Sequence, residues 1–144
     1  QLVLVVKKGS KYANATSLAD FSGAKVTAQL NTFHYSVIDQ IPGVDKQTAM
    51  DNFPAMRVAL QSGTIDAYVS ELPEAISAQA ANSDFVMVKL TDGFKTSPED
   101  TQTAVGVRKD SSLTKEINEA LKTISSEERQ KIMEEAIKNQ PAAE

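Results

Sequence analysis

The chain has 144 residues, which is enough for one ordinary domain with a substantial core. Nineteen acidic residues against fifteen basic ones give a net charge of −4, and aromatic residues make up only 6% of the sequence, with no tryptophan. Nucleic-acid binding needs a basic face and stacking aromatics, so this composition argues against it. The absence of cysteine excludes thiol catalysis, disulfides and thiolate metal sites.

The start of the sequence contains neither a membrane span nor a signal peptide. The apolar run Leu2–Val6 is far too short to cross a bilayer, and no charged region precedes it. There is also no initiator methionine before Gln1. We therefore expect Gln1 to lie inside a longer protein or to be a processed start.

The first predicted elements alternate between strand and helix. A run of Val and Leu predicts a strand at Leu2–Lys7, and a capped single helical turn follows within Thr16–Gly23. Lys25–Leu30 is predicted as a strand. A helix is then expected from Thr32 toward Gln40, because Asn31-Thr32 offers good N-cap residues.

The middle of the chain continues this alternation. Val44–Met50 is predicted as a weak strand that leads into a helix starting near Asp51 or Asn52 and ending at Ser62-Gly63. Ile65–Val69 is predicted as a strand and Pro73–Ala81 as a helix with its proline in the first turn. Phe85–Leu90 has the nearly continuous apolar character of a buried parallel strand.

The last third of the chain is more polar. Thr91–Thr103 is rich in turn residues and is a candidate hinge or crossover, after which a strand is expected at Ala104–Val107. Two amphipathic helices are predicted at Leu113–Ile124 and Glu127–Asn139, the second with a capping box at its start. Residues 140–144 should form a frayed end.

This order of elements predicts an α/β fold. Strands that alternate with helices favour a mostly parallel sheet with helices on both faces. We expect a three-layer arrangement with five strands, one of which is antiparallel.

The segment Gly63–Pro73 suggests a binding site. A turn glycine, a short β-rich run, the carboxylate of Glu71 and a helix-opening proline follow one another, so Glu71 should end a strand just before a helix. Ligands of open α/β sheets bind in the crevice outside such strand ends. The alternative is that Glu71 is a solvated loop acid or an acid favoured by the dipole of the helix that follows.

A second candidate site lies at the helix that begins after Asn31 and Thr32. Free N–H groups at a helix N-terminus attract a carboxylate, although an ordinary N-cap explains the same two residues without any ligand. His34, the only histidine, follows directly. No serine nucleophile stands in a recognisable elbow, so we interpret His34 as structural or solvated, with lining of the cleft mouth as the alternative.

Four segments carry a family resemblance. Leu2–Lys8 with Gly9-Ser10 is similar to the first strand after a crossing from another lobe, Ser17–Val26 (SLADFSGAKV) to the pattern S-L-x-D-L-x-G-K-x-V, Leu60–Ala67 (LQSGTIDA) to L-x-x-G-x-I-D-A, and Ala104–Lys109 (AVGVRK) to a return crossing. In this order and spacing they resemble lobe two of a type II solute-binding protein of the polar amino-acid ABC importer family.

The resemblance implies a function and a set of ligand-binding residues. The chain would be the substrate-binding component of an importer, with a periplasmic-binding-protein-like type II fold, capturing an L-amino acid without catalysis, metal or cofactor. Glu71 stands where the family binds the ligand's α-ammonium group. The family's Gly-Thr-Thr loop corresponds to Asn31, Thr32 and Phe33, which keeps one threonine hydroxyl at the helix start.

The resemblance also implies a domain organisation. Residues 1–103 would be the ligand-binding lobe, and residues 104–144 a return strand and C-terminal helices that pack on lobe one. Lobe one would precede Gln1, so the chain is expected to be a fragment whose hinge bends near Gln1 and near Thr101–Ala104. Without that lobe, the apolar faces of the return segment should fold back on lobe two or pair with a second copy of the chain.

Location and partners follow from the same resemblance. The protein would be an extracellular or periplasmic lipoprotein, anchored through an upstream segment, and would deliver its ligand to ABC permease subunits. Two alternatives share the architecture: the effector-binding lobe of a transcription regulator, which would need an upstream helix-turn-helix, and a dehydratase, for which only Thr32 could serve as the catalytic residue. The sequence does not name the amino acid.

Overall fold

The computed structural model describes residues 1–139 of the chain. The chain divides into two compact units, the first from Gln1 to Thr101 and the second from Gln102 onward. The frayed end predicted for residues 140–144 lies outside the described residues.

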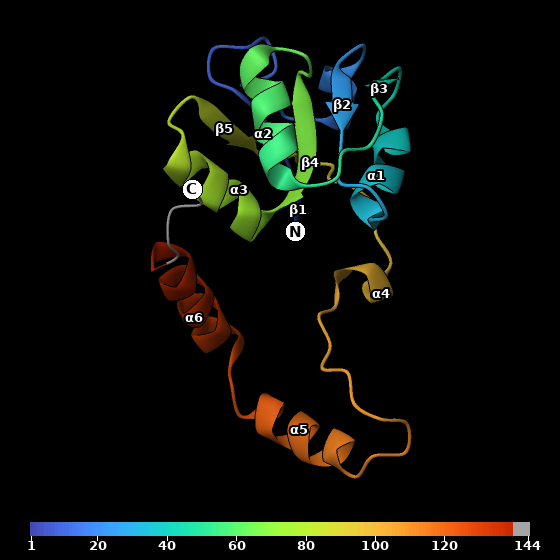
Figure 1. Ribbon diagram of the computed structural model, residues 1–144, viewed down its shortest axis with the longest axis vertical. Coiled ribbons are helices and arrows are strands. Elements are labelled where there is room, and N and C mark those ends of the chain that lie inside the picture. Colours follow the sequence, from blue (N-terminus) through green and yellow to red (C-terminus); the bar gives the residue numbers. More distant parts are fainter. Residues whose placement is uncertain (140–144) are drawn as a thin grey trace. The chain divides into compact units, whose positions relative to one another are not determined.

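The first unit is built on one five-stranded sheet with the spatial order β3-β2-β4-β1-β5 (Figure 1). β2, β3 and β4 are parallel to one another, whereas β1 pairs antiparallel with both β4 and β5. The predicted α/β class, with a mostly parallel sheet and one antiparallel strand, is therefore confirmed. In chain order the strands are β1 (Leu2–Lys7), β2 (Lys25–Thr27), β3 (Asp45–Lys46), β4 (Ala67–Glu71) and β5 (Phe85–Val88).

Short helices connect these strands, as the alternation of patterns predicts. The helix expected after Thr32 begins as α1 but tightens into the 3-10 turn η2, and the polar stretch predicted as a hinge contains the short helix α4. The elements are η1 (Leu18–Phe21), α1 (Phe33–Val37), η2 (Ile38–Gln40), α2 (Phe53–Ser62), α3 (Leu72–Ala81) and α4 (Pro98–Thr101). Local chemistry sets both ends of α2: the Asn52 side chain accepts a hydrogen bond from the backbone N–H of Ala55, and Gly63 ends the helix with φ of 79°.

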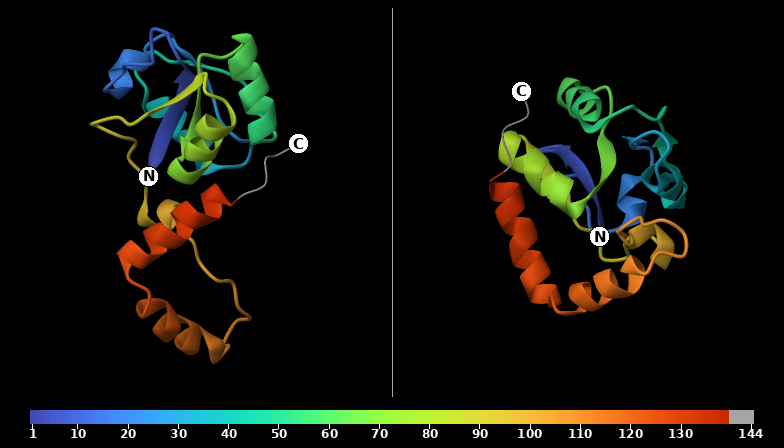
Figure 2. Two further views of the ribbon diagram at one scale, coloured as in Figure 1. Left: turned by 90° about the vertical axis from the view of Figure 1, so that its left-hand side faces the viewer. Right: turned by 60° about the horizontal axis from the view of Figure 1, so that its bottom comes forward.

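The sheet separates two halves of the hydrophobic core, which gives three layers. η1, α1 and η2 cover one face, where Leu4 and Val6 of β1 point. The other face is covered by α2 and α3, which pack on Val3 and Val5 (Figures 1 and 2). β1 is buried on both faces, which explains its uninterrupted run of Val and Leu.

The direction of β1 decides what lies at the carboxyl ends of the other strands. Leu2, the first residue of β1, is paired with Glu71, the last residue of β4. The antiparallel strand β1 therefore starts at the edge where the parallel strands finish. Glu71 lies at this edge, as the segment Gly63–Pro73 predicts.

The second unit contains two helices, α5 (Leu113–Lys122) and α6 (Ser126–Lys138). Both predicted helices are confirmed, and the Ser125 side chain caps α6 by accepting a hydrogen bond from the Glu128 backbone N–H at 3.1 Å. Large apolar side chains remain exposed on both helices: Leu113, Leu121, Ile132 and Met133. The unit thus has amphipathic helices without a covered core.

The strand predicted at Ala104–Val107 is wrong. The segment has no regular secondary structure, and Val105 is 59% exposed. A strand requires a partner for its backbone N–H and C=O groups, and no described residue pairs with this segment. Apolar alternation alone therefore does not make it a strand in this chain.

Tyr68 of β4 is a buried residue whose hydroxyl group should not be needed for the stability of the fold. Its side chain is fully buried, and its hydroxyl has no hydrogen-bond partner among residues 1–139. Burial raises the pKa of Tyr68, and the charge of Glu74 adds to the effect. In the unfolded chain the phenol ionises near pH 10, so the folded state loses stability as pH rises above about 10.

We expect Tyr68→Phe to leave the free energy of unfolding at pH 7 unchanged, or to raise it by about 1 kcal/mol, because it removes an unsatisfied hydroxyl. The loss of stability above about pH 10 should also become smaller. Urea denaturation of both proteins at neutral and alkaline pH measures the two effects. A loss of 2 kcal/mol or more at pH 7, about the cost of leaving a buried partner unpaired, would show that the hydroxyl has a partner after all.

Candidate functional site

The edge of the sheet at the end of β4 forms the candidate site. Glu71 is the last residue of β4 and the N-cap of α3, and its side chain is 53% exposed. Because Glu71 ends the strand, its carboxylate lies outside the core. The chain then continues as the helix α3, which begins at Leu72. The carboxylate is therefore fixed at its base and open to solvent at its tip.

The predicted loop of Asn31, Thr32 and Phe33 joins β2 to α1, with Phe33 as the first residue of the helix. Asn31 has a φ of 59°, a left-handed conformation that asparagine tolerates better than most residues. It can thus replace a glycine in this loop without a large cost. Thr32 is the N-cap of α1, but its hydroxyl donates to the carbonyl of Gln29 at 2.7 Å instead of capping the helix.

This hydrogen bond changes which groups of the loop can meet a ligand. The single hydroxyl proton of Thr32 is already donated to Gln29, so the hydroxyl is not a free donor. The backbone N–H groups of Thr32 and Phe33 donate to no other described residue. These two N–H groups are the donors that remain for an anion.

His34 joins the loop to the strand end. Its ring lies at 4.5 Å from the ring of Phe33, and its Nε2 atom lies 3.4 Å from Oε1 of Glu71. The side chain is buried, so of the two interpretations, structural or solvated, the structure agrees with the first. No local pattern predicts its contact with Glu71, because the two residues are on different elements far apart in the chain; the alternative that His34 lines the cleft mouth is the one indication.

A partly buried ion pair fixes the other side of the same strand end. Arg57 of α2 donates to Oε1 of Glu74 through Nη2 at 2.7 Å and through Nε at 3.2 Å. Ser70 donates to the second oxygen of Glu74, on the face of β4 opposite to Glu71. Burial lowers the pKa of Arg57, but the hydrogen bond and charge of Glu74 outweigh it and raise that pKa. The pair ties α2, β4 and α3 together where Glu71 emerges.

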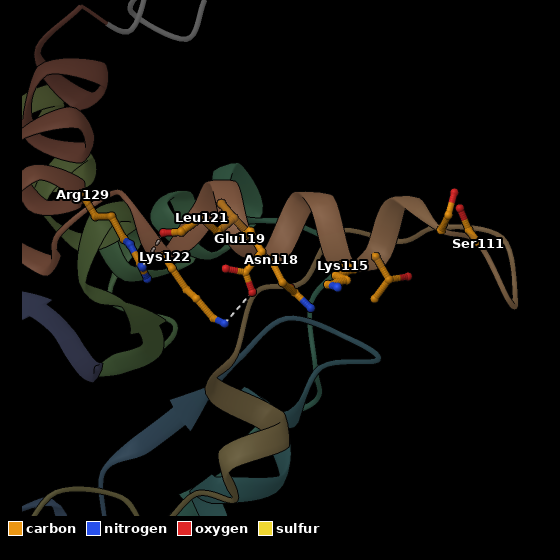
Figure 3. Close-up of a pocket in the computed structure, with 9 residues that line it drawn as sticks. Ser111, Lys115, Asn118, Glu119, Leu121, Lys122 and Arg129 are labelled. Carbon is orange, nitrogen blue, oxygen red and sulfur yellow. Dashed lines mark hydrogen bonds and ion pairs between the residues drawn. The ribbon is translucent and has the colours of Figure 1, made fainter.

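A hollow of about 730 Å³ lies elsewhere, in the second unit (Figure 3). It is lined by residues of α5 and by Arg129 of α6, and the Lys122–Glu119 ion pair crosses part of it. Arg129 donates to the carbonyls of Leu121 and Ile124, so its charge is used to close the end of α5. None of the four predicted site residues lines this hollow.

The chemistry of the sheet edge suits a small zwitterion. The Glu71 carboxylate can accept hydrogen bonds from a cationic group, and the N–H groups of Thr32 and Phe33 can donate to an anionic one. Within residues 1–139 no group of three or more His, Asp or Glu side chains could hold a metal ion. No helix in the same range is long and apolar enough to cross a membrane.

No protein-family model and no curated protein matches the sequence. Solved structures do match. AbpA, an amino acid ABC transporter substrate-binding protein from Streptococcus pneumoniae bound to L-arginine, superposes with a TM-score of 0.73 and 25% identity over 96% of this chain and 57% of its own. An ancestral arginine-binding protein bound to glutamine gives a TM-score of 0.65 and 30% identity over 93% of this chain and 58% of its own.

The comparison with a single isolated lobe shows the reverse pattern of coverage. Domain 2 of TmArgBP matches with a TM-score of 0.56 and 26% identity, covering 99% of that domain and 63% of this chain. The chain thus spans a little over half the length of the complete binding proteins but contains nearly the whole of one isolated domain. In fold and extent, the chain resembles lobe two of the amino-acid ABC transporter substrate-binding proteins.

Proposed function

We propose that this chain is the second lobe, with its return segment, of the extracytoplasmic substrate-binding component of an amino-acid ABC importer. The observation that carries the proposal is the position of Glu71, a half-exposed carboxylate at a strand end next to a loop with free N–H donors. The solved structures that match are binding proteins for amino acids, which supports the same role.

The ligand is an L-amino acid held by its backbone groups. Glu71 takes the α-ammonium group, and the N–H groups of Thr32 and Phe33 take the α-carboxylate. These contacts are common to all amino acids, so they do not select a side chain. Because AbpA was solved with L-arginine, arginine is the first ligand to test.

The rest of the proposal concerns the whole protein. A first lobe upstream of Gln1 supplies the other wall of the cleft, and hinge closure near Gln1 and near Thr101–Ala104 encloses the ligand. The closed form docks on ABC permease subunits at the outer face of the membrane, where an upstream segment anchors the protein. No chemistry is done on the ligand, and no cofactor takes part.

Titrating the full-length protein with each of the twenty amino acids by calorimetry tests the proposed function. We expect micromolar binding of at least one L-amino acid and much weaker binding of its D-enantiomer, because with both backbone groups held, the D-enantiomer points its side chain in a different direction within the closed cleft. Failure to bind any amino acid would overturn the proposal.

Glu71→Gln in the full-length protein should lower the affinity roughly ten- to a hundredfold. The substitution keeps the shape of the side chain but removes the charge that faces the ammonium group, an interaction of about 1.5–3 kcal/mol. Asp84→Asn, which removes an exposed charge just before β5 begins, is the matched control and should leave affinity unchanged. An unchanged dissociation constant in Glu71→Gln would rule out the assignment.

Thr32→Ala should lower the affinity about two- to tenfold, whereas Thr32→Ser should leave it nearly unchanged. Alanine loses the hydrogen bond from the hydroxyl to the Gln29 carbonyl, which holds the loop in place, and serine keeps it. The fold-loss in affinity should be equal for every amino acid that binds, because the loop contacts the α-carboxylate, which all amino acids share. Calorimetric titrations of two different amino acids check this, and an unequal loss would place Thr32 at the side chain instead.

A further inference from the structure

We propose that His34 is a positioning residue that holds the Glu71 carboxylate through its Nε2–H group; the inference rests on the proposed function of Glu71. The two residues come from different elements, α1 and β4, which pack against each other. His34 does not face solvent and would not replace Glu71 as the ligand's partner. It fixes the direction in which the carboxylate points.

The burial of His34 calls for a hydrogen-bond partner. Only 9% of its side chain is exposed, and neither ring nitrogen makes a hydrogen bond to a residue among 1–139. Buried polar groups in native proteins are nearly always paired. We therefore expect the N–H group of the imidazole to donate a hydrogen bond to a nearby acceptor.

Glu71 is the acceptor that the geometry offers. The gap of 3.4 Å between His34 Nε2 and Glu71 Oε1 exceeds a good hydrogen bond by only about half an ångström. The histidine ring is enclosed by the core, whereas the glutamate side chain is half exposed and free to rotate. A small rotation of Glu71 closes the gap and leaves its other oxygen free for a ligand.

Other polar groups near α1 are already engaged or face elsewhere. The Tyr35 hydroxyl donates to the carbonyl of Gln47, and Asp39 of η2 is paired with Lys46. Tyr68 belongs to the core cluster on the opposite face of β4. Glu71 is the one acidic group among the described residues within ion-pair distance of the ring.

The arrangement would help binding in two ways. A carboxylate held by one oxygen has less side-chain freedom to lose when the ligand arrives. The hydrogen bond to one oxygen also leaves the second oxygen of Glu71 free to accept from the ammonium group. Lysine or arginine at position 34 would occupy the carboxylate with a competing positive charge.

The first test is spectroscopic and needs no ligand. His34 is the only histidine of this chain, so its side-chain Nε2–H gives a single resonance in ¹H–¹⁵N spectra. We expect this proton to exchange slowly in the wild-type chain and about ten times faster or more in Glu71→Met, which removes the acceptor but keeps the length. Exchange that is unaffected by Glu71→Met would overturn the proposal.

The second test measures affinity in the full-length protein. His34→Phe keeps a ring but removes the donor, and should weaken amino-acid binding about two- to tenfold, whereas His34→Gln, whose amide can reach the same place, should restore most of it. Adding His34→Phe to Glu71→Gln should cost little more than Glu71→Gln alone. A loss of equal size in both backgrounds would show that His34 acts through packing, not through Glu71.

The two tests separate the two proposals. If no amino acid binds but Glu71→Met still accelerates exchange, the proposed function fails and the contact stands. If amino acids bind and Glu71→Gln weakens them, but the exchange test is negative, the function stands and the role of His34 fails.

Discussion

On its own, the 144-residue chain is expected to bind an amino acid no more tightly than about 1 mM, a free energy near 4 kcal/mol. In the proposed two-lobed protein this chain supplies only one wall of the cleft, and its Glu71 side chain is 53% exposed. Charge pairs formed through solvent are worth about 0–1 kcal/mol each. Two or three such contacts fall well short of the roughly 8 kcal/mol that micromolar binding needs. Calorimetry on the chain measures this directly.

The full-length protein is the control for this prediction, with micromolar affinity expected once both lobes enclose the ligand. The chain alone should also associate with itself, because Leu121 of α5 and Ile132 of α6 leave large apolar surfaces uncovered. Light scattering over a concentration series would show this. Micromolar binding by a monomeric chain would contradict the proposed two-lobed site.

The largest expected effect on stability comes from Arg57→Met. The substitution leaves the carboxylate of Glu74 with little exposure and without its cation. Removing one partner of a buried ion pair costs about 3–5 kcal/mol. Because both side chains keep some contact with water, we expect the free energy of unfolding to fall by about 2–4 kcal/mol. Urea denaturation followed by circular dichroism measures the change.

Two further variants test the physical reason. Arg57→Met combined with Glu74→Met removes both charges and should recover much of the loss, since a buried pair replaced by apolar side chains is often nearly neutral. Asp39→Asn breaks the Asp39–Lys46 pair, in which Asp39 is mostly exposed, and should cost no more than about 1 kcal/mol. Equal losses in Arg57→Met and in the double variant would show that Arg57 stabilises the fold by packing.

Local patterns in the sequence predict most of the fold. The bounds of β1 agree with the predicted Leu2–Lys7. An uninterrupted run of Val and Leu of this length favours a strand over a helix or a loop. Asn52, Gly63 and Ser125 mark helix ends correctly, since capping is a matter of adjacent residues. These features depend on contacts within a few positions.

Elements whose formation depends on distant partners are predicted less well. The strand expected at Ala104–Val107 does not form because no partner strand is present among the described residues. The weak strand expected in Val44–Met50 shrinks to Asp45–Lys46, at the edge of the sheet beside β2. Apolar alternation shows that a segment can form a strand, but pairing decides whether it does.

In the candidate site, too, some features follow from neighbouring residues in the sequence and others depend on distant contacts. The position of Glu71 at a strand end follows from its neighbours in sequence, and the structure places it there. Its proximity to His34 and the support from Arg57 and Glu74 cannot be predicted in this way, because folding brings these residues together from separate elements. Whether Asn31, Thr32 and Phe33 contact a ligand stays a prediction.

The inner position of β1, between β4 and β5, has a consequence for synthesis on the ribosome. Within this chain β1 is translated well before its partners, since β4 and β5 begin only at Ala67 and Phe85. Until β4 has left the exit tunnel, the run Leu2–Val6 has two unpaired edges and two uncovered apolar faces. Such a segment is prone to aggregate, and pairing over this sequence distance is slow. We therefore expect the nascent chain to need a chaperone, or residues translated before β1, to shield β1 until β4 is available for pairing.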